Sequence, residues 1–160
     1  MRFMAGKKTN LGPIGTNVAN TVRQLREDRR LGYAELSRQL ADIGREIPPL
    51  GLRRIESGER RVDVDDLVAL AFVFDVSPLA LLLPTEPSPL TPQGETYPME
   101  QIWQWGEGLH PLPREGAPGR DLVRHTRFLT ESRPHMQADW EQFLRATTAS
   151  ETEVPSDGDD

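Results

Sequence analysis

The chain has 160 residues, no cysteine and a formal net charge of −6 at pH 7. The lack of cysteine excludes a disulfide framework and a thiolate zinc site, and no apolar run reaches the ~18 residues that span a bilayer. The opening residues, MRFMAGKKTNLGPIG, are too polar for a secretory signal. We therefore expect a cytoplasmic protein without a membrane segment.

The charge is divided unevenly along the chain. Residues 1–83 hold 13 Lys/Arg and 11 Asp/Glu, a net +2, whereas residues 84–160 hold 6 and 14, a net −8. Because phosphates would repel the second half, any contact with nucleic acid is expected from basic patches in the first half. The acidic half is either a solvated surface or a surface that binds a partner protein, and its composition favours neither.

A first helix is expected after residues 1–13, which lack an apolar period and are interpreted as a flexible N-terminal arm. Thr16 or Asn17 is the candidate N-cap, because a short side-chain oxygen can accept an orphan backbone N–H. A core-facing stripe at helical spacing follows, formed by Val18, Val22 and Leu25. Gly32 is expected to separate this helix from the next one.

Two short helices are predicted next. The first covers residues 34–43 and ends at Gly44, and the second begins at Pro49, since proline is accepted in a first helical turn. Gly58 then provides a left-handed stop for the second helix. Ser37 is small and lies in the middle of its helix, where it allows the following helix to cross closely.

A fourth and a fifth helix complete the predicted domain. Asp63 is the N-cap candidate of the fourth, whose apolar run VALAFVF indicates burial on most sides. Ser77 and Pro78 begin the fifth, which continues as LALLL. Five helices over residues 14–84 are enough to close one small core.

The segments AELSRQL, LRRIESGERR and DVDDLVALAFVFDVSPLALLL, in this order, resemble the XRE family of helix-turn-helix proteins, the lambda-repressor/Cro type, over roughly residues 16–83. The resemblance implies an all-α fold in which a five-helix lambda-repressor-like DNA-binding domain spans residues 14–84. The connection ADIGREIPP is longer than is usual in the family. Pro49 and Leu50 also stand where relatives carry polar residues, and neither can donate a hydrogen bond to a base edge.

The resemblance also implies roles for individual residues. It places on the groove-facing side of the third helix the residues Pro49, Leu50, Arg53 and Arg54. It places at the DNA phosphates the residues Tyr33, Ser57, Arg60 and Arg61. It further implies a structural ion pair between Arg26 and Glu56. Arginine can contact guanine O6 and N7, and Leu50 can contact a thymine methyl, whereas phosphate contacts carry no sequence information.

The second half begins with a proline-rich linker expected at residues 85–98. A helical C-terminal region is expected at residues 99–147, with Trp103 and Trp105 as part of a small core or an interface. Amphipathic helices are expected at residues 121–131 and 136–146. Their apolar area is small for an independent core, so this region is expected to support oligomerisation. Residues 148–160 are interpreted as a disordered acidic tail.

No pattern of catalysis or cofactor binding was found, so an enzyme is not expected. His110, His125 and His135 have no metal-site spacing, and no phosphate-binding glycine loop is present. The leading hypothesis is a sequence-specific regulator of transcription, repressor-like, that binds double-stranded DNA as a homodimer. The alternative is an antitoxin-like or other interaction module, in which the acidic half binds a partner protein through residues 99–147.

Overall fold

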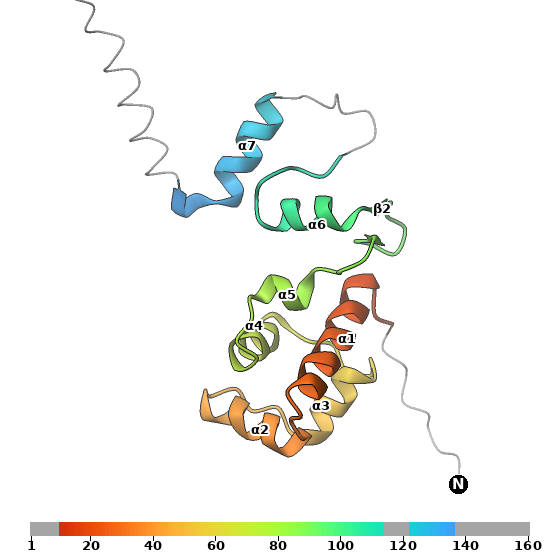
Figure 1. Cartoon of the computed structure of the whole chain (residues 1–160), viewed down its shortest axis with the longest axis vertical. Coiled ribbons are helices and arrows are strands. Elements are labelled where there is room, and N and C mark those ends of the chain that lie inside the picture. The colour runs from red at the N-terminus through yellow and green to blue at the C-terminus, as the bar shows by residue number, and fades with distance from the viewer. Residues whose placement is uncertain (1–9, 114–121, 137–160) are drawn as a thin grey trace, which may run out of the picture. The chain divides into compact units, whose positions relative to one another are not determined.

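The computed structural model describes residues 10–113 and 122–136, and within them the chain is all-α apart from one short strand pair (Figure 1). Its helices are α1 (Pro13–Asp28), α2 (Tyr33–Asp42), α3 (Pro49–Glu56), α4 (Val64–Val73), α5 (Pro78–Leu82), α6 (Met99–Gly106) and α7 (Leu122–Ser132), with a 3-10 turn at Pro134–Met136. The chain forms two compact units, Met1–Gly106 and Glu107–Asp160. Within the described ranges, no helix combines the length and apolarity needed to cross a membrane.

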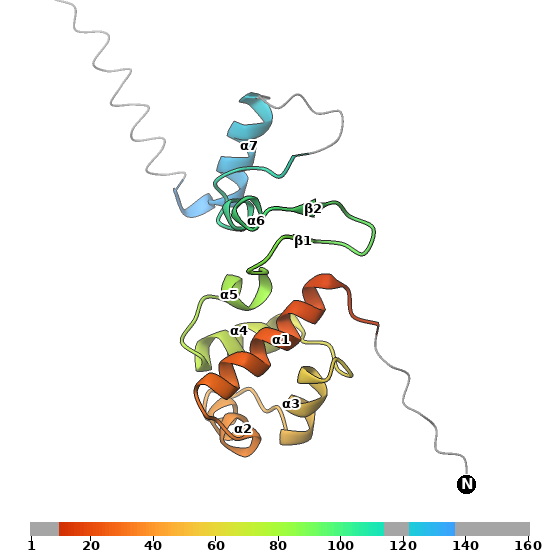
Figure 2. The same ribbon diagram turned by 45° about the vertical axis from the view of Figure 1, so that its right-hand side comes forward.

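Helices α1 to α5 enclose one apolar core in the first unit. Both views show α1 running diagonally beside α3 and α5, while α2 packs against α3 and α4 (Figure 2). The largest fully buried apolar side chains are Val22, Leu36, Leu40, Ile47, Leu52, Ile55, Leu70, Phe74 and Leu81, together with Ile102 of α6. Full burial of each such side chain contributes about 1.5–3 kcal/mol, so the predicted stripes of α1 to α5 are what hold this unit together.

Local chemistry sets most helix ends where the sequence indicates them. Gly44 and Gly58 have φ of +82° and +73°, conformations that a residue with a Cβ rarely adopts. The Asp63 side chain accepts the N–H of Asp66 at 2.8 Å and so caps α4. Ser77 caps α5 in the same way through the N–H of Ala80.

The predicted start of the first helix is wrong by one turn. Helix α1 begins at Pro13 with Gly12 at the N-cap, because the fixed φ of proline is already helical. Thr16 therefore lies inside the helix. Asn17 has a tertiary role instead, since its Nδ2 donates to the carbonyls of Leu81 and Leu82, both at 3.2 Å.

Residues 85–98 differ from the extended linker that their prolines indicate. Strand β1 (Ser88–Pro89) pairs antiparallel with β2 (Thr96–Tyr97), and α6 follows as part of the first unit. Ile102 of α6 is fully buried, and the Trp103 indole N–H donates to the carbonyl of Pro84 at 3.0 Å. The first unit thus extends to Gly106 because α6 covers apolar surface at the end of α5.

The second unit is described from residue 107 to 113 and from 122 to 136. Helix α7 lies within one residue of the predicted helix at 121–131, and none of its residues is buried. The Arg124 guanidinium donates to the Leu112 carbonyl at 2.7 Å, and the rings of His110 and His125 lie 5.0 Å apart. Most of the helix predicted at 136–146, the tail at 148–160 and residues 1–9 of the arm lie outside the described residues.

Candidate nucleic-acid interface

The connection between α2 and α3 is packed into the first unit. Ile47, near its end, is 1% exposed and belongs to the core. The Ser37 hydroxyl of α2 donates to the Ile47 carbonyl at 2.7 Å, which joins the middle of α2 to the residues that precede α3. The additional residues of this connection therefore carry α3 to a defined starting point at Pro49.

Helix α3 has a buried face and an exposed face. Its buried face consists of Leu52, Ile55 and Glu56. On its exposed face, Leu50 is 58% exposed, and both Arg53 and Arg54 are exposed as well. The residues that the resemblance places toward a DNA groove thus share the side of α3 that does not face the core.

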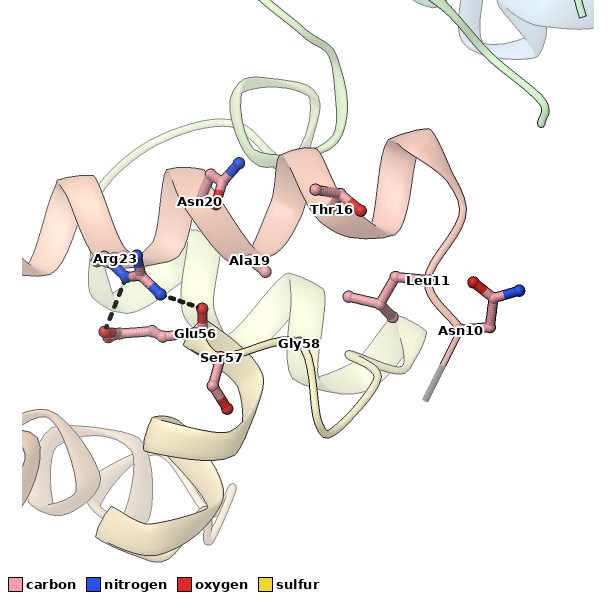
Figure 3. A pocket seen from close by; sticks show the side chains of 9 residues that line it. All are labelled: Asn10, Leu11, Thr16, Ala19, Asn20, Arg23, Glu56, Ser57 and Gly58. Carbon is pink, nitrogen blue, oxygen red and sulfur yellow. Dashed lines mark hydrogen bonds and ion pairs between the residues drawn. The ribbon is translucent and has the colours of Figure 1, made fainter. Parts of the chain in front are cut away.

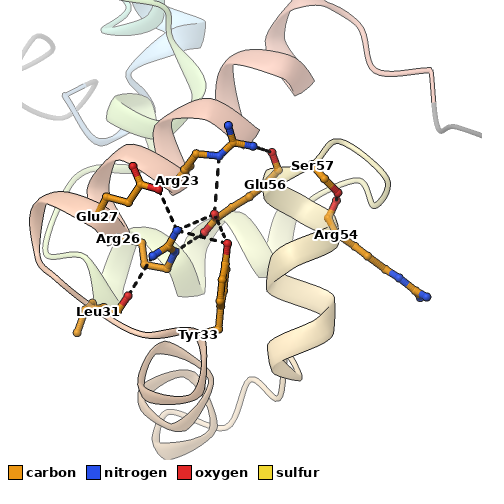
Figure 4. A network of polar contacts seen from close by, with 8 residues as sticks. All are labelled: Arg23, Arg26, Glu27, Leu31, Tyr33, Arg54, Glu56 and Ser57. Atoms are coloured by element: carbon orange, nitrogen blue, oxygen red, sulfur yellow. Dashed lines mark hydrogen bonds and ion pairs between the residues drawn. The ribbon is translucent and has the colours of Figure 1, made fainter.

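Glu56 is a buried carboxylate at the end of α3, and α1 and α2 supply its partners (Figure 4). Arg26 of α1 approaches it through two nitrogens, Nε at 2.6 Å from Oε1 and Nη2 at 3.0 Å from Oε2. The Tyr33 hydroxyl of α2 donates to Oε2 at 2.8 Å. Arg23 of α1 donates to the backbone carbonyl of Glu56. Three helices therefore meet at one side chain.

The electrostatics of this cluster favour the ion pair. The hydrogen bond to Glu56 raises the pKa of Arg26 further above its ordinary value, although burial opposes the shift. Only 11% of the Arg26 side chain and 2% of the Glu56 side chain are exposed, so water screens their attraction weakly. A planar guanidinium that binds both carboxylate oxygens fixes orientation as well as distance.

The Tyr33 ring lies close to two arginines. The Cζ of Arg26 is 4.3 Å from the centroid of its ring, and the Cζ of Arg53 is 5.1 Å away. Burial and the hydrogen bond to Glu56 raise the pKa of the Tyr33 phenol. Its ring thereby supports Arg53 on the exposed face of α3, while its hydroxyl, which the resemblance places at a phosphate, is bound to Glu56.

A second acidic residue, Asp66 in the first turn of α4, is fully buried and paired with two arginines. Arg60, just after α3, donates to its Oδ2 at 2.7 Å, and Arg45, from the α2–α3 connection, donates to its Oδ1 at 2.7 Å. Arg45 also binds both oxygens of Asp63 at 2.9 Å. This cluster is not apparent in the sequence, because Arg45 and Arg60 belong to separate segments that only the fold brings to Asp66.

A surface pocket of about 550 Å³ lies between α1 and the end of α3 (Figure 3). Its lining residues are Asn10, Leu11, Thr16, Ala19, Asn20, Arg23, Glu56, Ser57 and Gly58. Ser57 is exposed there, and beyond Gly58 the Arg61 guanidinium donates to the Asn10 carbonyl at 3.1 Å. Ser57 and Arg61, both assigned to phosphates by the resemblance, thus lie close to the end of α3.

No family model matches the chain, and comparisons with curated proteins and with solved structures gave no match either. Within residues 10–113 and 122–136, no group of three or more His, Asp or Glu side chains is arranged to hold a metal ion.

Proposed function

We propose that the chain is a sequence-specific, double-stranded-DNA-binding regulator of transcription, and that α1 to α5 form a lambda-repressor-like helix-turn-helix domain. The observation that carries this proposal is the exposed face of α3, where Arg53 and Arg54 are exposed while Leu52 and Ile55 on the opposite face are buried. A short helix with two outward arginines, anchored by a second helix beside it, suits insertion into a major groove.

In this proposal, α3 provides the base contacts. Arg53 and Arg54 donate to guanine O6 and N7, and the exposed Leu50 packs on a thymine methyl. Pro49, at the first turn, contacts the groove without hydrogen bonding. Two properties support Arg53 in this role. It is exposed, and the Tyr33 ring lies 5.1 Å from its guanidinium. Contact with the ring already restricts the Arg53 side chain, so less side-chain entropy is lost on binding.

Contacts at the end of α3 fix the position of the domain on the duplex. Ser57 and Arg61 lie there and suit phosphate oxygens, as a hydroxyl and a guanidinium respectively. The buried Arg26–Glu56 pair holds this end of α3 against α1, so the angle of α3 toward DNA is set before binding. Preorganisation of this kind reduces the entropic cost of association.

The proposal further includes repression by a cytoplasmic homodimer that reads two half-sites. Two copies of one recognition helix multiply the discrimination of each, and their half-sites are expected about 10–10.5 base pairs apart, or a multiple of that. Self-association is assigned to residues 99–147, the same region that a partner protein would occupy in the alternative function.

The test is selection of bound duplexes from a random pool at one stated salt concentration. The full chain is expected to enrich one motif made of two related half-sites, and Arg53→Ala is expected to relax the motif at defined positions. Arg30→Ala is the matched control, because it removes the same charge from an exposed position in the turn between α1 and α2. A pool that stays random after repeated selection would overturn the proposal.

A further inference from the structure

We propose that Arg60 is a positioning residue, which braces the first half of α3 against α4, and not a phosphate contact. The proposal rests on the proposed function for its DNA-binding arm, but the brace itself is a property of the folded chain. It concerns Arg60, which the resemblance places at a phosphate, and three positions outside the predicted DNA surface, Gly51, Asp66 and Arg45.

The path of the Arg60 side chain explains why a glycine lies inside α3. A Cβ added at Gly51 would lie 2.8 Å from Nη1 of Arg60, and 3.2 Å from Cγ2 of Ile47. A glycine within a helix costs about 1 kcal/mol relative to alanine. Here its missing side chain gives the guanidinium room to pass close to the first turns of α3.

The Arg60 guanidinium pairs with the buried carboxylate of Asp66. The Asp66 side chain is 1% exposed, and Arg60 binds its Oδ2 at 2.7 Å. Burial of an ionised carboxylate is costly unless it is paired. Arg45 satisfies the other oxygen, and the backbone N–H of Asp66 donates to the Asp63 side chain. Asp66 therefore holds the Arg60 guanidinium beside Gly51 of α3.

Arg45 extends the brace to the α2–α3 connection. It binds Asp63 and Asp66 together, so the connection is tied to the start of α4. Arg60 ties the residues that follow α3 to the same turn of α4. The segment before α3 and the segment after it are thereby both fixed to the Asp66 carboxylate, although the connection that leads into α3 is long.

Arg61 provides the contrast. It is exposed, and its Nη2 donates to the uncharged carbonyl of Asn10. Among residues 10–113 and 122–136, no carboxylate forms an ion pair with it. Arg60 is 35% exposed and could reach a phosphate with Nη2 only by leaving Asp66. The two neighbouring arginines are therefore expected to respond differently to salt.

The first experiment needs no DNA. Amide hydrogen exchange is measured for wild type, Arg60→Ala and Gly51→Ala, with α1 amides as the internal reference. We expect exchange in α3 to accelerate at least about tenfold more than in α1 in Arg60→Ala, because loss of the brace opens α3 locally. The acceleration is expected to be smaller in Gly51→Ala, whose methyl group displaces only the end of the Arg60 side chain. Unchanged exchange in α3 of Arg60→Ala would overturn the proposal.

The second experiment measures the salt dependence of binding to the selected duplex. Arg60→Ala is expected to weaken binding without a change in the slope of log K against log salt concentration, whereas Arg61→Ala reduces the slope by about 0.9. An equal reduction by Arg60→Ala would identify it as a phosphate contact and overturn the proposal. If the wild-type chain selects no DNA, the proposed function fails, and the exchange experiment still decides whether the brace exists.

Discussion

Arg26 and Glu56, thirty residues apart, are joined by two hydrogen bonds, from Nε to Oε1 at 2.6 Å and from Nη2 to Oε2 at 3.0 Å. Because both side chains are nearly inaccessible, removal of either one leaves the other as a buried charge without its bidentate partner. We expect Arg26→Ala and Glu56→Ala each to lower the free energy of unfolding by about 3–5 kcal/mol. Denaturant melts of both single variants and the double variant measure the coupling.

The control for this cycle is the pair Glu35 and Arg38, whose side chains are 39% and 67% exposed. Their guanidinium and carboxylate lie equally close, at 2.7 Å, so proximity is matched while burial is not. The control pair is expected to show far weaker coupling, because solvent screens it. Additive costs for Arg26→Ala and Glu56→Ala would contradict the buried pair.

The Tyr33 phenol provides a prediction about pH. Burial and the hydrogen bond to Glu56 raise its pKa above the ordinary value of 10.0, so folding favours the neutral form. The stability from this hydroxyl is therefore complete below pH 10 and is lost as the pH rises through the folded-state pKa. Tyr33→Phe is expected to lose about 1 kcal/mol at neutral pH, and to decline less steeply than wild type above pH 10.

The matched control is Tyr97→Phe, which removes the other tyrosine hydroxyl of the chain. Urea melts at several pH values between 8 and 11 provide the comparison. If wild type and Tyr33→Phe lose stability in parallel over that range, the phenol does not couple folding to pH.

Helix ends were predictable because their causes are local. Gly44 and Gly58 terminate helices through positive φ, Pro49 begins one, and Asp63 and Ser77 cap two others. Each effect is complete within a few residues, so sequence alone contains it. The predicted start of α1 was wrong because Pro13, whose fixed φ is helical, begins the helix before Thr16 and Asn17 are reached.

Tertiary pairing was far less predictable. Arg60 was assigned to a phosphate, and nothing in its neighbours shows that its guanidinium reaches Asp66. Arg45 was part of an unexplained extension, and its two carboxylates lie 18 and 21 residues further along the chain. The Arg26–Glu56 pair was anticipated through a family resemblance, since spacing alone does not specify that two helices cross at those residues.

Arg53 and Arg54 are expected to distinguish selected DNA from random DNA. Arg53→Ala and Arg54→Ala should each weaken binding to the selected duplex by about 1–3 kcal/mol, the value of one bidentate guanine contact. Binding to a random duplex should change less. Arg61→Ala should weaken both duplexes alike, as expected for a phosphate contact. Fluorescence titrations at matched salt measure all three, and equal losses on both duplexes for Arg53→Ala and Arg54→Ala would remove them from base reading.

Self-association is predicted to require the C-terminal region. A chain that ends at Gly106 retains the whole first unit and lacks α7 and the residues that follow. It is expected to sediment as a monomer at concentrations where the full chain forms a dimer. Dimerisation of the shortened chain as tightly as the full chain would place the interface within the first unit.

Helix α6 is predicted to be part of the cooperative first unit. Ile102 is fully buried, and Gly106 lies so close to Leu83 that an added Cβ would be 2.5 Å from its Cδ1. Ile102→Ala is therefore expected to cost about 2–5 kcal/mol in denaturant melts. A chain that ends at Pro84 should likewise be less stable than one that ends at Gly106, because it exposes Leu83.

Exposed Met99 provides the control, and Met99→Ala should change stability little. Equal midpoints for the two shortened chains would show that α6 packs without stabilising the first unit.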